Sequence, residues 1–468
     1  MTDGGIPRRS WLILALVSGG QMATTFASSA LNVGFGVIEA DLDVERTTLA
    51  WTISGYAIAA AALLLTAGRT ADRIGGRRVF LAGIATFGIG SVVCAVAPGV
   101  ELLVGGRIVQ GLASAALIPS SLTLALQAFP AQHRGLAIGV WGAIAAIAGA
   151  SGPPLGAALI DLGTWRSVFV ALAAISIVVF AVGRVVLVET PTSTEAGRLD
   201  VWSGPMASIA VGLVIAVLLQ GQDWGWTSVR AVGALVVAAA LLALVIGRSR
   251  RHPTPFVDLG LLRQPRFASA SATTALFNAA TSGFWLGAPL FLQTIWGWGV
   301  LASGFGVVAS PLTHLTFAVP MGRLADRGHH KALMVGGSVT TGAALAGMAL
   351  VVTETSSYWT TVLPFTILFG FGSGMAWPVF TSGALLDVAP EQYGQANGMN
   401  LTMRQFGAAL GVAVIVAVIG NSGSATVDDF RTAWAVLAAV LGSCAVVLAT
   451  IYPPAPRPAA VTARARPS

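Results

Sequence analysis

Apolar runs of about 20 residues recur along the whole chain, separated by short polar segments. The runs lack the strict apolar–polar alternation of membrane-spanning strands, so the pattern predicts transmembrane helices rather than a barrel. We expect an all-α membrane protein with 14 transmembrane helices. The expected spans are 11–38, 49–67, 79–97, 102–128, 136–160, 167–188, 203–220, 229–247, 267–295, 301–321, 332–352, 359–386, 397–420 and 433–452.

Basic residues concentrate in every second polar segment. With the N-terminus in the cytoplasm, the outer side keeps four basic residues, Arg46, Arg166, Arg230 and Arg431. This bias follows the positive-inside rule and predicts a multi-pass protein with both termini in the cytoplasm. Lys331 is the one lysine among 26 basic residues, a bias typical of a GC-rich bacterial genome, so we expect the bacterial inner membrane.

The composition agrees with a membrane protein. Of 468 residues, 55% are hydrophobic and 10% are charged, too few charges to cover the surface of a soluble protein of this length. The net charge of +7 does not indicate a nucleic-acid partner, because the cations lie at helix ends rather than in one patch. Cys94 and Cys444 both fall in apolar runs, so neither a disulfide nor a metal site is expected.

Two short segments of the chain resemble each other. Residues 68–78 are GRTADRIGGRR and residues 322–331 are GRLADRGHHK. Each links an expected inward-running helix to an outward-running one, at the same place in a six-helix half if the seventh and eighth helices are an insertion. A shared G-R-x-A-D-R favours duplication over two independently basic loops. We expect a substrate site between two similar halves. The expected parts are an N-terminal half at 1–190, two inserted helices at 191–266, a C-terminal half at 267–452 and a disordered cytoplasmic tail at 453–468.

The first of these segments resembles the loop motif G-x-x-x-D-R-x-G-R-R of the major facilitator superfamily. The sequence LLVGGRIVQGLASAALIPS at 102–120 is similar to that family's fourth-helix R-x-x-Q-G motif, and GASGPPLGAAL at 149–159 is similar to the fifth-helix G-P-x-x-G motif of its antiporters. With WTISGYAIA at 51–59 and MRQFGAALG at 403–411, the order of motifs resembles the fourteen-helix drug:proton antiporter branch. The resemblance covers nearly the whole chain.

The resemblance implies a gating role at the cytoplasmic helix ends. A carboxylate such as Asp72 can accept hydrogen bonds from free N–H groups at a helix end of the other half, and nearby arginines can pair with acids across the same seam. Such contacts would hold the cytoplasmic side shut until the halves rock apart. Anchoring of the topology by positive charge alone is the alternative. The residues assigned to gating are Gly68, Asp72, Arg73, Gly75 and Arg77, with Gly322, Asp326 and Arg327 in the second copy.

Arg107 lies several residues inside the fourth expected helix, where a lone arginine costs about 2.5–3.5 kcal/mol. It should therefore face a watery cavity or a partner. Gln110, three residues further on, lies on the same helix face. The resemblance implies that Arg107 acts in proton transfer or in the electrostatics of the cavity. Snorkelling toward the outer interface is the alternative.

Small residues shape the fifth expected helix. Gly149, Gly152 and Gly156 let a neighbouring helix approach closely, and Pro153 interrupts the backbone hydrogen bonding. The resemblance implies that this motif helps to close the outer side and is associated with export. Ordinary small-residue packing is compatible with that role.

Further polar groups lie inside the spans. In the first helix, Ser28, Ser29 and Asn32 recur at three to four residues and can share one face of a substrate cavity, or bond to backbone and neighbouring helices. His314 can change charge near neutral pH and is a candidate for proton coupling, although a buried neutral histidine is commoner. For Arg404, pairing with Asp387 or a loop acid is an equal alternative to a cavity role. The other cavity candidates, for which helix packing competes, are Gln110, Asn278, Trp377 and Gln405.

One position departs from the family's pattern. The fourteen-helix branch commonly has an Asp in its first helix, five residues before an Asn; the Asn matches Asn32, but Ala27 occupies the acidic position. No Asp or Glu lies in the middle of any expected span. Coupling would then run through His314, Arg107 or Asp72, or transport would proceed without tight proton coupling. This charge balance favours neutral or anionic amphipathic substrates over strongly cationic dyes.

The leading interpretation is a secondary-active exporter of small amphipathic organic compounds, a drug, antibiotic or natural product, working by alternating access and driven by protons. A metabolite facilitator or importer without tight coupling is the alternative. A membrane sensor or enzyme is a third class, but the five histidines lack metal-ligand spacing, so we expect no enzymatic activity, metal or cofactor. No G-x-x-x-x-G-K-[ST] motif is present, so ATP does not drive transport. We expect a monomer.

Overall fold

The computed structural model describes residues 6–130, 133–189, 200, 202–252, 255, 257–389, 392–420 and 425–454. The surroundings of some residues inside helices, among them Gly68, Asp72 and Arg73, and nearly all of the expected tail lie outside the described part. The described residues form helices and connecting loops with no strand among them, which confirms the predicted all-α class.

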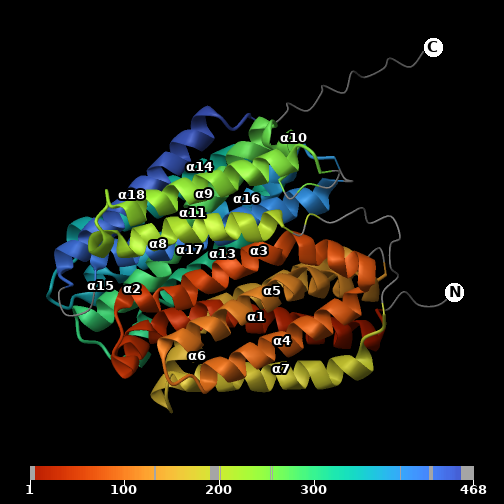
Figure 1. Cartoon of the computed structure of the whole chain (residues 1–468), viewed down its shortest axis with the longest axis horizontal. Helices are drawn as coiled ribbons and strands as arrows, with labels where there is room; N and C mark the ends of the chain where they lie inside the picture. Colours follow the sequence, from red (N-terminus) through yellow and green to blue (C-terminus); the bar gives the residue numbers. More distant parts are fainter. Residues whose placement is uncertain are drawn as a thin grey trace, which may run out of the picture.

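The helices follow the chain in the order drawn in Figure 1. The elements are α1 (Arg8–Leu42), α2 (Arg46–Leu49), α3 (Trp51–Ile74), α4 (Gly76–Ala95), α5 (Val100–Ala128), α6 (Arg134–Asp161), α7 (Arg166–Val186), α8 (Ser203–Trp224), α9 (Val229–Ser249), α10 (Leu259–Leu262), α11 (Pro265–Thr294), α12 (Val300–Gly306), α13 (Ala309–Leu324), the π-helical turn η2 (Ala325–His329), α14 (His330–Val351), α15 (Tyr358–Thr361), α16 (Leu363–Leu385), α17 (Tyr393–Ile419) and α18 (Val427–Thr450).

Thirteen stretches of the described chain are long and apolar enough to cross a membrane, judged by length and composition. One of them, Val300–Val351, is 52 residues long and contains both α13 and α14. A single helix of that length would measure about 78 Å, far more than the thickness of a bilayer. This stretch therefore crosses twice, and the described residues carry the fourteen predicted spans.

The two similar segments found in the sequence turn at corresponding glycines. Gly75 ends α3 with a φ of 104°, and Gly328 separates α13 from α14 with a φ of 92°. Only glycine adopts such left-handed backbone without strain. The repeat thus preserves a glycine of positive φ at the turn, although ψ differs, being 132° at Gly75 and 8° at Gly328.

The two halves of the chain pack by the same pattern. In the first half, α3 and α4 both pack on α5, α1 packs on α6, and α7 covers α4. In the second half, α13 and α14 both pack on α16, α11 packs on α17, and α18 covers α14. Figure 1 shows the first half below and the second above, meeting along α1, α3 and α17. This equivalence is the pseudo-symmetry that the repeated segments predict.

Close-packed glycines join the equivalent pairs α1–α6 and α11–α17. A Cβ added to Gly152 would lie 1.8 Å from the hydroxyl oxygen of Ser29 on α1. On α17, a Cβ added to Gly407 or Gly411 would lie 2.1 Å or 2.0 Å from a backbone carbonyl oxygen of α11. Because lipid supplies no hydrophobic force between helices, such close backbone approach is what stabilises helix pairs in a membrane.

Helices α8 and α9 pair with each other outside the two halves, and α8 lies against both α3 and α17. Much of the surface of α9 is apolar and exposed, as expected for a helix in contact with lipid. Asp200 accepts hydrogen bonds from Ser203 and, at 3.1 Å, from Arg248 at the end of α9. Burial by itself raises the pKa of Asp200. The hydrogen bonds lower the pKa by more than burial raises it, so the pKa is below its ordinary value and the ion pair persists.

Candidate functional site

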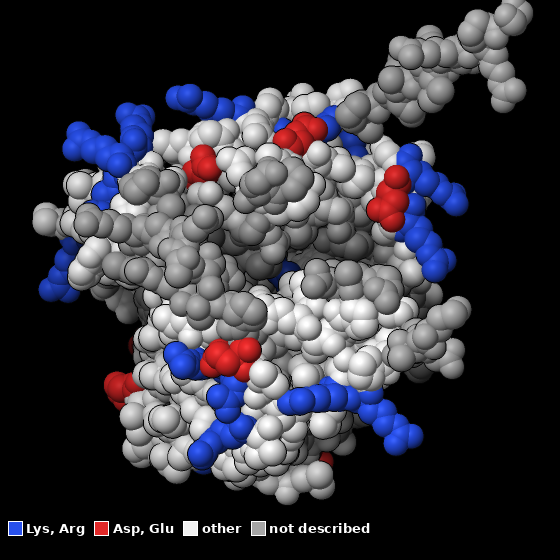
Figure 2. All heavy atoms as spheres, turned by 90° about the vertical axis from the view of Figure 1, so that its right-hand side faces the viewer, with Lys and Arg blue, Asp and Glu red and all other residues white. Residues whose placement is uncertain are grey.

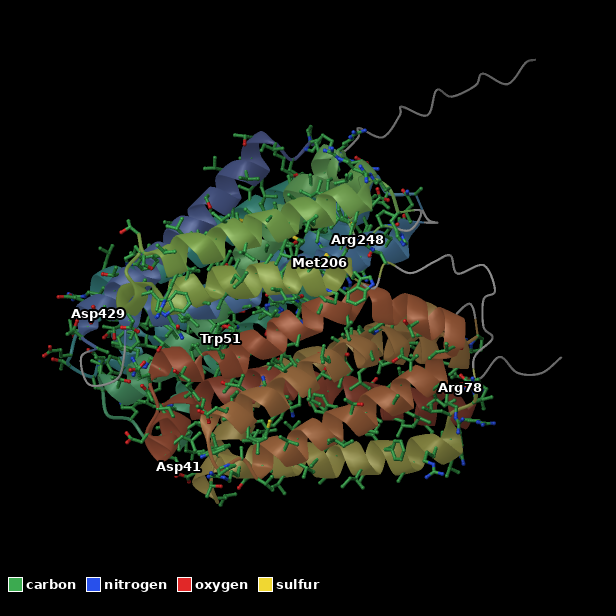
Figure 3. All side chains as sticks on the ribbon, viewed as in Figure 1. Asp41, Trp51, Arg78, Met206, Arg248 and Asp429 are labelled. Carbon is green, nitrogen blue, oxygen red and sulfur yellow. The ribbon has the colours of Figure 1, made fainter. Side chains whose placement is uncertain are left out.

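A cavity of about 1000 Å³ lies between the two halves. It is lined by α1, α3, α5 and α6 from the first half and by α11, α13, α16 and α17 from the second. The lining runs from Asn32 and Val412, deep between the halves, to Thr123 and Gln395 close to the helix ends. Figure 2 views the right-hand side of Figure 1 and shows a hollow between the halves on that face. We call this face the open end; Figure 3 shows Arg78 there, and Asp41 and Asp429 at the opposite end.

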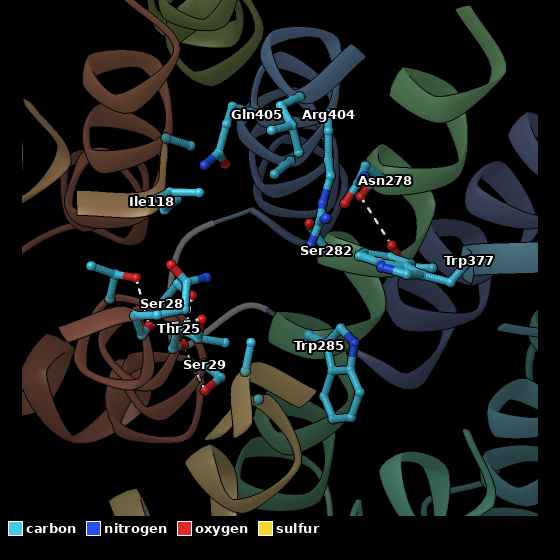
Figure 4. Close-up of a pocket in the computed structure, with 18 of the residues that line it drawn as sticks. Thr25, Ser28, Ser29, Ile118, Asn278, Ser282, Trp285, Trp377, Arg404 and Gln405 are labelled. Carbon is cyan, nitrogen blue, oxygen red and sulfur yellow. Dashed lines mark hydrogen bonds between the residues drawn. The ribbon is translucent and has the colours of Figure 1, made fainter. Parts of the chain in front are cut away.

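One wall of the cavity is a polar face of α1. Its lining residues follow one another at helical spacing: Gln21, Thr24, Thr25, Ser28, Ser29 and Asn32. Ser28 and Ser29 donate their hydroxyl hydrogens to the carbonyl oxygen of Thr25, at 2.8 Å and 3.1 Å. Both residues belong to the cavity lining, and Figure 4 shows them on α1 across from Arg404 and Trp377; the Oδ1 atom of Asn32 is buried and has no partner among the described contacts. This wall therefore presents hydroxyl oxygens that can accept hydrogen bonds, together with the amide groups of Gln21 and Asn32.

Ala27 does not line the cavity. Its side chain is 1% exposed and packs in the hydrophobic core of the first half. The position at which the family resemblance led us to expect an acid therefore faces the protein interior, away from the α1 wall. An acid introduced there would be buried rather than presented to the cavity.

The opposite wall combines a cation with aromatic rings. Arg404 on α17 places its guanidinium over the ring of Trp377 at 4.4 Å, and His314 Nδ1 lies 3.0 Å from the hydroxyl of Ser373. Figure 4 shows Arg404, Trp377 and Asn278 together, facing the serines of α1 across the cavity. Gln405 also belongs to the lining. The cavity candidates named from the sequence thus converge, with the exception of Gln110.

The alternative that Arg404 pairs with Asp387 is wrong. Asp387 instead accepts a hydrogen bond from Arg266, at the start of α11. Among the described residues, no Asp or Glu lines the cavity, and no ion pair involves Arg404. The positive charge of Arg404 therefore has an aromatic neighbour but no counterion.

Arg107 is fully buried and reaches the cavity from α5. Its Nε donates to the carbonyl of Thr52 at 2.9 Å, its Nη1 donates to Gln110 at 2.8 Å, and its guanidinium lies 4.3 Å from the ring centre of Tyr56. The alternative that it snorkels outward is therefore wrong. Gln110 lies behind Arg107 rather than in the lining, because its amide donates to Ser91 at 2.8 Å.

The end opposite the open end is closed by contacts between the halves; we call it the sealed end. Arg46 pairs with Glu39 at 3.2 Å and donates to the carbonyl of Gly420 in the second half, also at 3.2 Å. Gln293 of α11 donates to the carbonyl of Val33 on α1 at 3.0 Å. These contacts were not predicted from the sequence. The signal in the sequence is Glu39, an acid directly after the first expected span and seven residues before Arg46.

The glycine–proline motif of α6 lies at this seal. Gly149, Gly152 and Gly156 face α1, with Thr25, Ser29 and Ala30 as their neighbours. The carbonyl of Pro153 and the side chain of Ala157 face Gly304 of α12, where an added Cβ would lie 2.8 Å and 2.6 Å from them. The motif therefore holds α6 between α1 and α12 where the two halves meet.

We expect Gly304→Leu to prevent the sealed end from closing, since a leucine does not fit against Pro153 and Ala157. The measurement is labelling of Ser282→Cys, a cavity position, by a membrane-impermeant thiol reagent added at the sealed end. Cys94 and Cys444 are 0% exposed, so the background is low. We expect labelling at least about tenfold faster than in the parent, with no change for Gly299→Leu, where an added Cβ meets nothing within 4 Å. Equal labelling of both variants would contradict the packing argument.

The segments assigned to gating lie at the open end. Arg77 donates to the carbonyl of Arg184 at 2.9 Å and Arg78 pairs with Glu189 at 3.3 Å, both within the first half. In the second copy, Asp326 and Arg327 are exposed, and an added Cβ on Gly322 would meet nothing within 4 Å. The surroundings of Gly68, Asp72 and Arg73 lie outside the described part, so their gating role stays a prediction.

Comparison with known proteins places this architecture in a family. The sequence profile of the Major Facilitator Superfamily matches residues 17–200 and 267–468, leaving out the segment that holds α8 and α9. A methylenomycin A resistance protein of Streptomyces coelicolor is 31% identical over 88% of this chain and 86% of its own length. A multidrug resistance protein of Mycobacterium tuberculosis is 30% identical, over 90% and 78%. A cephamycin export protein of Amycolatopsis lactamdurans is 29% identical, over 88% and 85%.

A solved structure has the same fold. The crystal structure of the nucleoside transporter NupG superposes with a TM-score of 0.66 and 16% identity, covering 95% of this chain and all of that one. This likeness concerns the arrangement of the helices.

Proposed function

Because the chain belongs to the major facilitator superfamily, in its fourteen-helix drug:proton antiporter branch, we propose that it is a proton-driven exporter of small amphipathic organic compounds. It is a multi-pass protein of the bacterial cell membrane and a transporter rather than an enzyme. The relatives named for resistance to methylenomycin A and for export of cephamycin support export as the direction.

The observation that carries the proposal is a cavity open at one end and sealed at the other. A volume of about 1000 Å³ accommodates a drug-sized molecule. Exchange of the seal between the two ends would expose the cavity to each side in turn, which is alternating access. Positive-inside charge bias supports a cytoplasmic position for the open end and for both termini.

The moving bodies in this proposal are the N-terminal half at 1–190 and the C-terminal half at 267–452. The inserted helices at 191–266 would lie along the boundary between the two halves, since α8 contacts both α3 and α17. The omission of residues 201–266 from the match to the family profile supports their status as an insertion. We expect the protein to work as a monomer.

The test of export is efflux from proteoliposomes across a chemically broad panel of compounds, with and without an imposed pH gradient. Proton-driven export requires accumulation of at least one compound against its gradient, lost when the pH gradient is collapsed. Transport that is unaffected by collapse would remove proton antiport and favour the facilitator. The lack of any carboxylate among the described lining residues is the observation that supports that second candidate.

We expect His314→Ala to abolish the dependence of efflux on the pH gradient while downhill transport continues. His314 lies in the lining beside Ser373, and an imidazole exchanges a proton near neutral pH, unlike the two arginines of the lining. The measurement is the ratio of efflux rates with and without the gradient. His133→Ala, in the loop before α6, is the control. Retained coupling in His314→Ala would exclude His314 and direct attention to Arg107 and Asp72.

A further inference from the structure

The charges of the cavity lining are one-sided. Among the described residues, the lining contains Arg107, Arg404 and His314 but no Asp or Glu. Arg107 is engaged by Thr52, Gln110 and Tyr56, all of them neutral groups. A cation held away from bulk water without a counterion is costly, and an anionic ligand would relieve that cost.

Arg404 is the cation best placed to receive an anion. It is half-buried, with one face of its guanidinium against Trp377 at 4.4 Å. No hydrogen bond from its guanidinium occurs in the described part of the chain, and Arg404 belongs to the cavity lining, so its N–H groups are available to a ligand there. A planar guanidinium fixed on an aromatic ring presents two parallel donors, the geometry that matches a carboxylate.

Aromatic rings surround this site on the side of the second half. Trp285, Phe369 and Trp377 all line the cavity. Phe369 stacks on the buried Phe284 at 3.9 Å, and Trp285 meets Phe369 edge-on at 6.5 Å. These contacts hold flat apolar surfaces next to Arg404, where an aromatic ring system can pack.

The α1 wall lies across the cavity from Arg404, as Figure 4 shows. The hydroxyls of Thr25, Ser28 and Ser29 donate their hydrogens to backbone carbonyls of α1, so their oxygens remain as acceptors. Groups that fill this side of the cavity can therefore donate hydrogen bonds to these oxygens, and the amides of Gln21 and Asn32 can in addition donate to those groups.

From the guanidinium of Arg404 without a counterion, the aromatic rings beside it and the α1 wall across the cavity, we propose that the substrate is an aromatic organic acid. Its carboxylate, or a comparable anionic group, binds Arg404; its ring lies against Trp285, Phe369 and Trp377; and a hydroxyl or amine at its far end donates to the α1 wall. The proposal rests on the transport function proposed above and narrows its substrate class.

The test is equilibrium dialysis of the purified full chain with 6-hydroxy-2-naphthoate, its neutral carboxamide and the corresponding trimethylammonium compound. We expect the acid to bind at least about tenfold more tightly than the carboxamide, because a hydrogen bond to a charged group is the stronger one. The ammonium compound should bind most weakly. Removal of the 6-hydroxyl group should weaken binding of the acid through loss of its donor to α1.

In Arg404→Gln the preference for the acid over the carboxamide should disappear, while binding of the carboxamide changes less than about threefold. Arg404→Lys keeps the positive charge but not the two parallel donors of the guanidinium, and it should retain part of the preference. This second variant tests the proposal even if Arg404→Gln does not fold. The matched control is Arg263→Gln, an exposed arginine outside the cavity, which should bind as the parent does.

Equal binding of all three probes, or an acid preference unchanged in Arg404→Gln, would overturn the proposal and leave export of neutral or cationic compounds standing. Failure of the whole efflux panel described above would contradict export itself, whichever probe binds best. The two failures are therefore separable.

Discussion

Replacing Arg46 by alanine should open the sealed end of the cavity. The side chains of Arg46 and Glu39 are 2% and 6% exposed, and Arg46 also bonds the carbonyl of Gly420 in the other half. Removal of one member of a buried ion pair leaves an uncompensated charge and costs about 3–5 kcal/mol. If this end opens, water solvates Glu39 and removes that cost. The conformation that is open at this end therefore becomes more populated.

The measurement is again the labelling of Ser282→Cys from the sealed end by a membrane-impermeant thiol reagent. A shift of about 3 kcal/mol changes the ratio of conformations by about 100-fold, and the labelling rate should rise toward that factor. Arg431→Ala is the matched control, since Arg431 forms an ion pair with Asp428 and bonds Val352 within the second half only.

A double variant separates the unpaired charge from the loss of packing. Replacement of both members of a buried ion pair by apolar residues is often tolerated. Arg46→Met with Glu39→Leu should therefore label more slowly than Arg46→Ala, although the bond to Gly420 is lost. If the double variant opens as much as the single one, the contact with Gly420 rather than the ion pair closes this end.

The fold could be predicted because membrane helices leave a strong pattern in the sequence. Each span must satisfy its backbone hydrogen bonds internally, so length and hydropathy alone mark it. The one ambiguous stretch, Val300–Val351, is resolved by the duplicated segment, whose turn falls at Gly328. The α1 wall could be predicted for a similar reason, because residues three to four apart share a helix face whatever the helix packs against.

Contacts between helices far apart in the chain could not be predicted in the same way. Gln110 lies on the same helix face as Arg107, but its direction is set by Ser91 of α4. Asp387 was a plausible partner for Arg404 from the sequence, but in the structure Asp387 pairs with Arg266 of α11. Arg46 counted as a loop charge in the topology, whereas packing buries it between the halves. Each outcome depends on rotation of helices about their axes, which hydropathy does not fix.

Arg107→Gln should lower transport by about 100-fold and destabilise the protein. The guanidinium ties the α3 backbone at Thr52 to Gln110 of its own helix, and both hydrogen bonds involve a charged donor. Hydrogen bonds to charged groups contribute about 1.5–3 kcal/mol each, and the variant would lose both. The loss should appear in initial efflux rates per reconstituted protein and as a lower unfolding temperature in detergent.

Arg107→Lys distinguishes geometry from charge. A lysine supplies a point charge but not the fork that reaches Thr52 and Gln110 together, so we expect it to restore little activity. Recovery of more than about half of the parent rate by lysine would show that the cavity needs only a positive charge at this position. Gln110→Leu provides the second arm: it removes a partner of Arg107 without touching the cavity lining. If the fork positions Arg107, this variant should slow transport as well, because the guanidinium then keeps its hydrogen bond to Thr52 and its contact with Tyr56 but loses the second hydrogen bond.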